Sequence, residues 1–194
     1  MIRMATLMGA SVLGPRLLAA TLDSTNSPDA APAFAPAERA LLDEIGDTII
    51  PTTDIPGAKA VGIGAFIAMM VRECYGAPNQ AAFKDGLAKI GNSFASRFGG
   101  TFLTGSPADR TTLLNELDAE QKRFTAETRR QRAAAVPPPE DEEPLHYFRM
   151  MKELTILGYF SSELGCTKAL RFTEVPGRFD GAAPYQKGEH AWFS

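Results

Sequence analysis

The sequence predicts an all-α protein, a compact bundle of about five helices followed by an irregular, aromatic-rich C-terminal arm. Three observations predict this class. Apolar residues recur at three- and four-residue spacing in several separate segments, as they do on the buried face of a helix. Gly, Pro and Ser-Pro signals separate these segments. From about residue 166 the helical spacing stops, although aromatic residues continue.

The size and charge of the chain indicate one soluble domain. At 194 residues, with 44% hydrophobic and 22% charged residues, the chain is long enough for a sizeable core. The formal net charge of −3 gives no reason to expect nucleic acid or an anionic membrane surface as a partner. The basic residues Arg129, Arg130 and Arg132 are followed closely by acidic residues 140–143, so their local fields largely cancel.

The N-terminal residues 1–22 resemble an export signal. Arg3 precedes an apolar stretch, and residues 18–20 form a small-residue region suited to cleavage. The same features fit the end of a twin-arginine signal whose arginine pair lies upstream. The alternative is an ordinary apolar helix. Because the stretch is short and is interrupted by Pro15, we do not expect it to span a membrane.

A linker and a first helix come next. Residues 23–36 are rich in Ser, Asn, Ala and Pro, which is typical of a linker to the helical domain of residues 37–194. The first helix is predicted over residues 37–50 and ends at Pro51. Its buried stripe consists of Leu41, Leu42, Ile45 and Ile49.

Two further helices are predicted over residues 63–75 and 80–98. Their stripes consist of Ile63, Phe66, Ile67, Met70, Val71 and Cys74 in the first, and Phe83, Leu87, Ile90, Phe94 and Phe98 in the second. The methionines are interpreted as core residues and not as metal or haem ligands. Gly76 is predicted to end the first of these helices. Gly86 and Gly91 cost about 1 kcal/mol each in helix propensity, which suggests close helix approach.

The last two helices have clear start signals. Ser106 as a cap, followed by Pro107 and Asp109, opens one of them. Its stripe is Leu113, Leu114, Leu117 and Phe124, and its polar end, residues 120–132, is predicted to be solvated or frayed. The other starts near Pro144 with a stripe of Phe148, Met151, Leu154 and Thr155, and Gly165 is predicted to be its left-handed stop.

The C-terminal arm changes character. Leu170, Phe172 and Val175 form a short extended run that ends at a Pro-Gly turn. The rest has neither helical period nor regular strand, and it carries Phe179, Tyr185, Trp192 and Phe193. We expect such an arm to lie either on the chain's own helices or on a partner, since aromatic residues anchor both kinds of contact.

We predict no catalytic, cofactor-binding or metal-binding residue in this chain. Two histidines and two cysteines without metal-ligand spacing argue against zinc or haem, and no phosphate loop or nucleophile with its base is present. His146 is predicted to be exposed and His190 to be a packing or interface residue. Asp43 and Asp47 are assigned to a solvated face. Asp54 is interpreted as a turn residue, with ligand binding as the alternative.

Cys74 and Cys166 allow three interpretations. In an oxidising compartment they would form a disulfide between two helices. Cys166, which lies just before the arm, would otherwise pair with a partner chain. The third interpretation is two reduced, buried thiols. The export-like N-terminus favours a disulfide.

Two motifs support a family resemblance. Residues 50–58 read IPxxDxPGA and residues 157–165 read LGYFSSxxG, and the turn at Pro176 and Gly177 adds to them. With these motifs, residues 41–181 resemble the small-subunit family typified by gluconate 2-dehydrogenase subunit 3.

The resemblance implies an accessory subunit without a cofactor of its own. Members of this family accompany a large FAD-dependent catalytic subunit of the glucose-methanol-choline (GMC) type, often with a multihaem c-type cytochrome. Their complexes oxidise gluconate and other sugars, including glucosides at carbon 3. The small subunit stabilises the large one, helps to export it to the periplasm and commonly bears the twin-arginine signal. Only Arg3 of such a signal is present here.

An accessory chain needs a large partner interface, and the aromatic arm fits that role. The predicted interface residues are Tyr159, Phe160, Cys166, Pro176, Phe179, Tyr185 and Trp192. Two other functions stay open: an interaction module unrelated to oxidoreductases, and a small enzyme that uses the Asp54 loop and His190.

Overall fold

The computed structural model describes residues 34–136, 144–175, 177, 181–182, 184 and 186–193. Contacts divide the chain after Ala31, and all described residues belong to the second unit. The predicted signal segment, residues 1–22, and most of the predicted linker lie outside the described residues.

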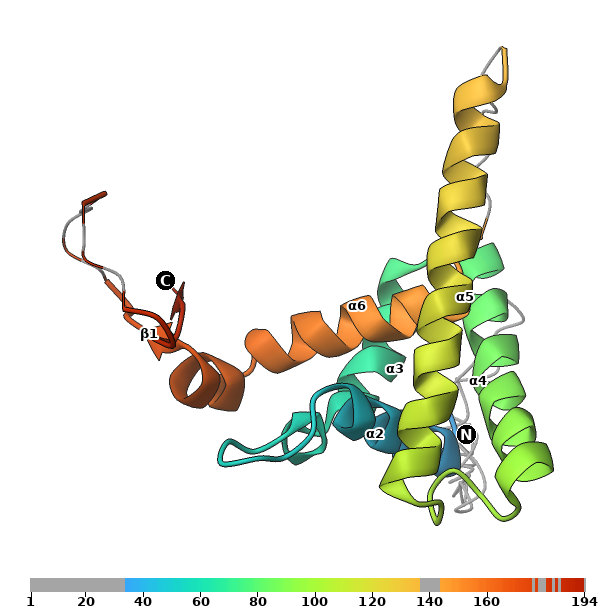
Figure 1. Ribbon diagram of the computed structural model, residues 1–194, viewed down its shortest axis with the longest axis horizontal. Helices are drawn as coiled ribbons and strands as arrows, with labels where there is room; N and C mark the ends of the chain where they lie inside the picture. The colour runs from blue at the N-terminus through green and yellow to red at the C-terminus, as the bar shows by residue number, and fades with distance from the viewer. Residues whose placement is uncertain are drawn as a thin grey trace, which may run out of the picture. The chain divides into compact units, whose positions relative to one another are not determined.

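The predicted all-α class is confirmed (Figure 1). The described α-helices are α2 (Pro36–Ile49), α3 (Ile63–Cys74), α4 (Ala77–Phe98), α5 (Pro107–Ala134) and α6 (Tyr147–Phe160). A 3₁₀ turn, η1 (Ala58–Val61), precedes α3, and a π-helical turn, η2 (Gly165–Ala169), follows α6. The arm contributes two short strands, β1 (Arg171–Phe172) and β2 (Trp192–Phe193), which pair in parallel.

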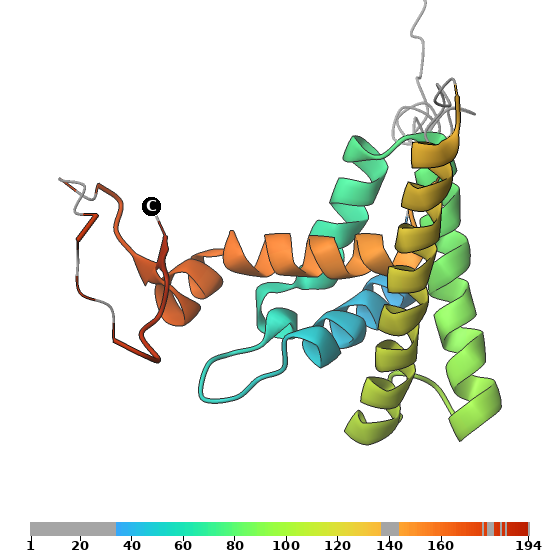
Figure 2. The same cartoon turned by 45° about the horizontal axis from the view of Figure 1, so that its top comes forward.

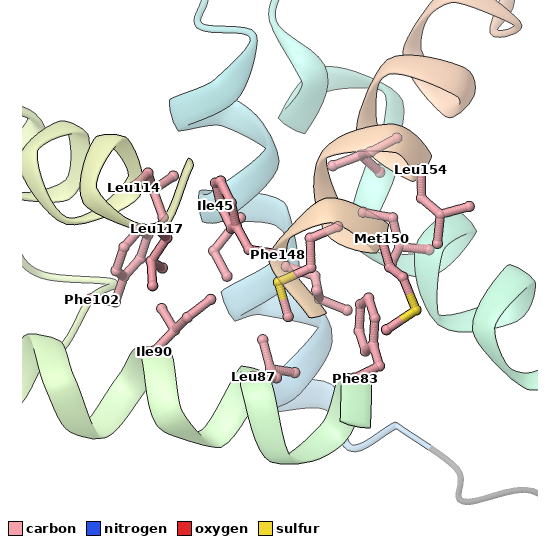
Figure 3. Close-up of a cluster of buried hydrophobic side chains, with 14 of the residues drawn as sticks. Ile45, Phe83, Leu87, Ile90, Phe102, Leu114, Leu117, Phe148, Met150 and Leu154 are labelled. Carbon is pink, nitrogen blue, oxygen red and sulfur yellow. The ribbon is translucent and has the colours of Figure 1, made fainter. Parts of the chain in front are cut away.

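Helix α6 lies at the centre of the bundle and contacts each of the other four described α-helices. Its predicted stripe is buried, together with Met150 and Tyr159. Figure 3 shows Phe148, Met150 and Leu154 of α6 meeting side chains of α2, α4 and α5, with Phe102 from the α4–α5 connection at one end. Burial of this apolar surface is the main stabilising term of such a bundle. The labelled core residues are Ile45, Phe83, Leu87, Ile90, Phe102, Leu114, Leu117, Phe148, Met150 and Leu154.

Helices α4 and α5 run side by side in opposite directions (Figures 1 and 2). The turn between them uses left-handed Gly99 and Gly100, with φ of 73° and 71°. Ser106 then caps α5, because its hydroxyl accepts the Asp109 N–H at 3.2 Å. Residues 120–132, predicted to be solvated or frayed, are mostly exposed, but they do not fray, since α5 stays helical to Ala134.

The predicted glycine roles are only partly correct. Gly86 does allow close approach, since a Cβ there would lie 2.1 Å from Tyr147 Cγ, whereas nothing lies within 4 Å of a Cβ at Gly91. Gly76 does not end α3 in a left-handed conformation; it precedes α4 with φ of −67°. Gly165 does not stop α6 either, because that helix ends at Phe160 and Gly165 begins η2.

Candidate partner interface

The loop between α2 and α3 contains the first motif and is held by specific hydrogen bonds. The Ala58 N–H donates to Ile50 O at 2.9 Å, and the Gly57 N–H donates to Thr52 Oγ1 at 3.0 Å. A Cβ at Gly57 would lie 2.6 Å from Ile50 O, so only glycine fits this close turn. Ala58 is fully buried. The motif therefore encodes a compact loop packed on the end of α2.

The second motif fastens this loop to α6. The Tyr159 hydroxyl donates to Pro56 O at 2.7 Å. Burial raises the pKa of Tyr159, so the hydroxyl keeps its proton for this bond. Gly158 lets α6 approach α3, because a Cβ there would lie 2.5 Å from a ring carbon of Phe66. A Cβ at Gly165 would lie 1.9 Å from Tyr159 O, so the chain passes closely over the end of α6.

A half-buried ionic cluster stabilises the same end of α2. The two carboxylate oxygens of Glu44 accept hydrogen bonds from Lys59 of η1 and from Arg110 of α5. Burial alone would raise the pKa of Glu44, but the hydrogen bonds and charges of Lys59 and Arg110 outweigh it and lower this pKa. Arg110 also donates to Leu103 O at 2.6 Å. The cluster thus joins three segments of the chain.

Exposed apolar side chains gather in the last part of the chain. On α6, Ile156 and Leu157 are 42% and 52% exposed, on the side of the helix away from its buried stripe. In the arm, Phe172, Val175 and Trp192 are exposed as well. Exposed apolar groups of this size mark candidate interaction surfaces.

The arm is closed by contacts of Arg171. The Arg171 N–H donates to Ala191 O at 2.8 Å, and its guanidinium forms an ion pair with Glu189 at 3.0 Å. The same guanidinium lies 5.2 Å from the centroid of the Trp192 ring. These contacts join the two ends of the arm, and Trp192 stays largely exposed to solvent.

Comparison with models of protein families identifies the family of this chain. The model of the family described as gluconate 2-dehydrogenase subunit 3 matches residues 36–177. The chain belongs to this family. The match runs from the first residue of α2 through β1 and includes both motifs. No curated protein and no solved structure matches the chain.

As a member of the gluconate 2-dehydrogenase subunit 3 family, the chain is of the accessory-subunit type. The described residues contain no group of three or more His, Cys, Asp or Glu side chains placed to hold a metal ion. Across the same residues, no helix has both the length and the apolar character needed to cross a membrane.

The predicted interface residues of this subunit differ in how exposed they are. Tyr159 and Cys166 are buried within the chain, Phe160 is half-buried, and Trp192 is 68% exposed. Pro176, Phe179 and Tyr185 lie outside the described residues. Tyr159 therefore stabilises the subunit's own loop, while Trp192 is accessible to a partner. Ile156 and Leu157 were missed, although two apolar residues opposite a buried helical stripe are visible in the sequence.

Both cysteines of the subunit are free thiols in this structure. Cys166 is buried and donates from its Sγ to Phe160 O at 3.1 Å. Cys74 is exposed, with its Sγ 3.9 Å from Met70 Sδ. The pairing of Cys74 with Cys166, or of Cys166 with a partner chain, stays a prediction.

Three polar residues lie in unexpected places. His146 is buried and not exposed; its Nδ1 accepts the Phe148 N–H at 3.3 Å and so caps α6. The predicted solvated face of α2 is wrong: Asp43 accepts the Gly64 N–H of α3 at 2.7 Å, and Glu44 is buried.

The two candidate residues of the alternative enzyme lie at the surface. Asp54 is an exposed turn residue that accepts a hydrogen bond from the Thr53 hydroxyl at 2.9 Å. His190 is exposed in the arm. Asp54 therefore lies in the turn that the sequence suggests, but the backbone N–H of Ile55 donates to the Thr53 hydroxyl and not to the Asp54 carboxylate.

Proposed function

We propose that this chain is the non-catalytic small subunit of a FAD-dependent dehydrogenase that oxidises a sugar or sugar acid. The complex would be of the gluconate 2-dehydrogenase or glucoside 3-dehydrogenase type. In this proposal the large GMC-type subunit carries FAD and the catalytic residues, and a c-type cytochrome subunit with haem c accepts the electrons. The small subunit stabilises the large one and helps to export it to the periplasm.

The exposure of apolar side chains from α6 into the arm carries this proposal. Leu157, Phe172, Val175 and Trp192 expose between 48% and 78% of their surface. An isolated pair of two-residue strands is marginal in water, so β1 and β2 gain stability from being covered. A large flavoprotein subunit supplies enough apolar surface to cover them, as expected of an obligate complex.

Co-expression with the large subunit tests the docking surface. We expect Leu157→Asp and Trp192→Ala each to reduce co-purification of the flavoprotein, because both remove apolar surface that is exposed in this chain. Val136→Asp is the matched control, since Val136 is 94% exposed at the end of α5. Circular dichroism would show that all variants fold. Undiminished co-purification of both interface variants would refute this docking surface.

Activity measurements separate an accessory subunit from an enzyme. We expect the chain alone to show no dye-linked dehydrogenase activity, and the complex to show it together with FAD absorbance. Ala variants of Asp54 and His190 should leave turnover in the complex almost unchanged. Activity of the isolated chain, or a loss of turnover in these variants without dissociation, would contradict the proposal.

Export is tested separately with the N-terminal segment. Removal of residues 1–22 should retain both subunits in the cytoplasm if this segment directs export. Addition of a complete twin-arginine signal should restore them to the periplasm. Unchanged periplasmic localisation after removal would assign export to another signal.

A further inference from the structure

A groove of about 450 Å³ lies between the 3₁₀ turn η1 and the segment that follows α6. The end of η1 forms one wall, directly after the first motif, and residues 162–168, which include most of η2, form the other. Its volume is in the range of small binding pockets. The lining residues are Ala60, Val61, Ser162, Glu163, Leu164, Thr167 and Lys168.

The uncharged part of the lining favours apolar contact. Val61 and Leu164 pack against the core and are only half-buried, so each also offers apolar surface to the groove. The hydroxyls of Ser162 and Thr167 donate to backbone carbonyl oxygens of the chain itself, at 2.6 and 2.7 Å. Because these donors are already used, the uncharged lining residues offer mainly methyl and methylene groups to a ligand.

The charged part of the lining is balanced. Glu163 contributes one carboxylate and Lys168 one ammonium group, and both residues are exposed. A lining with no net charge gives an ionic ligand no advantage, whereas an apolar side chain gains free energy when it leaves water. The described lining therefore selects an apolar group.

Hydrogen bonds within the chain fix both walls of the groove. The Gly165 N–H donates to Ser162 Oγ at 3.0 Å in one wall, and the Ala60 N–H donates to Gly57 O at 3.1 Å in the other. The Tyr159 hydroxyl, bonded to the loop before η1, holds the two walls together. A groove that is formed in advance binds its ligand at a lower cost in conformational entropy.

The groove is continuous with the exposed apolar surface on which the proposed function rests. Its second wall joins α6, which exposes Ile156 and Leu157, to β1, which exposes Phe172. Both α6 and β1 contact η2, and α6 also contacts η1. A partner that covers α6 and the arm therefore also covers the groove.

We propose that the groove receives one large apolar side chain, such as a leucine, methionine or phenylalanine, from the large flavoprotein subunit. The inference rests on the proposed function and deepens it, since it names the anchor point and the chemistry of the partner segment. A few apolar anchors in well-packed pockets supply most of the affinity of an interface, and the contacts around them exclude water. Leu157 and Phe172 provide such surrounding contacts.

Competition between two small subunits tests the groove. A tagged large subunit is co-expressed with wild type and one variant of this chain, and mass spectrometry measures their ratio in the purified complex, normalised to the amounts expressed. Ala60→Trp and Thr167→Trp each fill the groove from an exposed position, so no core packing is removed. We expect each variant to be under-represented by about tenfold or more. Ala133→Trp, at an exposed alanine of α5 outside the groove, should compete equally with wild type.

Two results separate the groove from the proposed function. If the large subunit retains wild type and both groove variants equally, the groove is not an anchor site, while the proposed function stands. If the large subunit does not retain even the wild-type chain, the proposed function fails, and the role of the groove fails with it.

Measurements on the isolated chain test the other possible occupants. Urea unfolding should give the same stability for wild type, Ala60→Trp and Thr167→Trp. Destabilisation by both Trp variants, without an effect of Ala60→Ser, would assign the groove to the chain's own arm and overturn the proposal. Light scattering should give the same mass for wild type and Ala60→Trp. A wild-type dimer that Ala60→Trp converts into monomers would assign the groove to a second copy, with the same consequence.

Discussion

The Tyr159 hydroxyl and the Pro56 carbonyl oxygen lie 2.7 Å apart, although 103 residues separate them in the sequence. This bond connects the two motifs on which the family resemblance depends. It fixes the loop before η1 to the last turn of α6, and so it couples the bundle to the segment that leads into the arm.

Loss of this bond should cost stability but not the fold. We expect Tyr159→Phe to lower the free energy of unfolding by about 1 kcal/mol, because the ring still packs while one hydrogen bond is lost. Urea unfolding measures the difference. Tyr75→Phe is the control, since the Tyr75 hydroxyl makes no hydrogen bond to any described residue. Equal effects of the two changes would show that the Pro56 bond contributes nothing.

Breaking the Glu44 cluster should reduce stability more than loss of the Tyr159 hydrogen bond does. Glu44→Gln leaves Lys59 and Arg110 close together without a carboxylate between them. We expect the free energy of unfolding to fall by about 2 kcal/mol. This is less than for a fully buried ion pair, because Lys59 is half exposed. Chemical denaturation provides the measurement. Glu116→Gln, which breaks the exposed pair with Arg97, should have no measurable effect; a loss as large as that of Glu44→Gln would contradict the argument.

Two glycines of α4 predict opposite outcomes for the same substitution. Gly86→Ala should destabilise by about 1–3 kcal/mol, because the new Cβ would lie 2.1 Å from Tyr147 Cγ and force α6 outwards. Gly91→Ala should stabilise by about 0.5–1 kcal/mol, since alanine favours the helix and nothing lies within 4 Å. Thermal unfolding of both variants checks the sign. Stabilisation by Gly86→Ala would show that the close contact relaxes freely.

Asp118 predicts an acid-dependent stability. Hydrogen bonds from Lys122 and Lys152 lower the pKa of its carboxyl from 3.8 to about 2. A lowered folded-state pKa stabilises the protein above the unfolded-state pKa, and this stabilisation is lost as the pH falls to the folded-state value. At neutral pH, the free energy of unfolding of the wild type should therefore exceed that of Asp118→Asn by about 1 kcal/mol, after allowance for solvent screening. The difference should shrink below about pH 4 and vanish near pH 2.

Urea unfolding over a series of pH values measures this dependence. Lys152→Gln removes one of the two cationic partners of Asp118. This variant should therefore lose less stability than the wild type as the pH falls through the same window. A stability difference between wild type and Asp118→Asn that persists unchanged at pH 2 would rule out the carboxylate as its source.

The helices were predictable because each has one long apolar stripe. Phe83, Leu87, Ile90 and Phe94 are spaced as a buried helical face, and all four are buried in α4. The distal half of α5 was predicted less well, since it has no stripe there; its Glu, Lys, Arg, Gln and Ala residues have high intrinsic helix propensity, which was the available signal.

The site was less predictable because it depends on distant contacts. In the sequence, Glu44 has the pattern of a surface acid, because its partner Arg110 lies 66 residues away. His146 is buried by its neighbours in space, among them Phe124 with its ring centroid 5.4 Å away.

The absence of a side chain at Gly165 has an evolutionary consequence. With no room for even a methyl group beside Tyr159 O, almost every missense change at this codon must displace the backbone that follows. Such a change would alter the direction of the whole tail while leaving the bundle able to fold. Assembly with another polypeptide could then be lost through one nucleotide, in a protein that still accumulates in the cell.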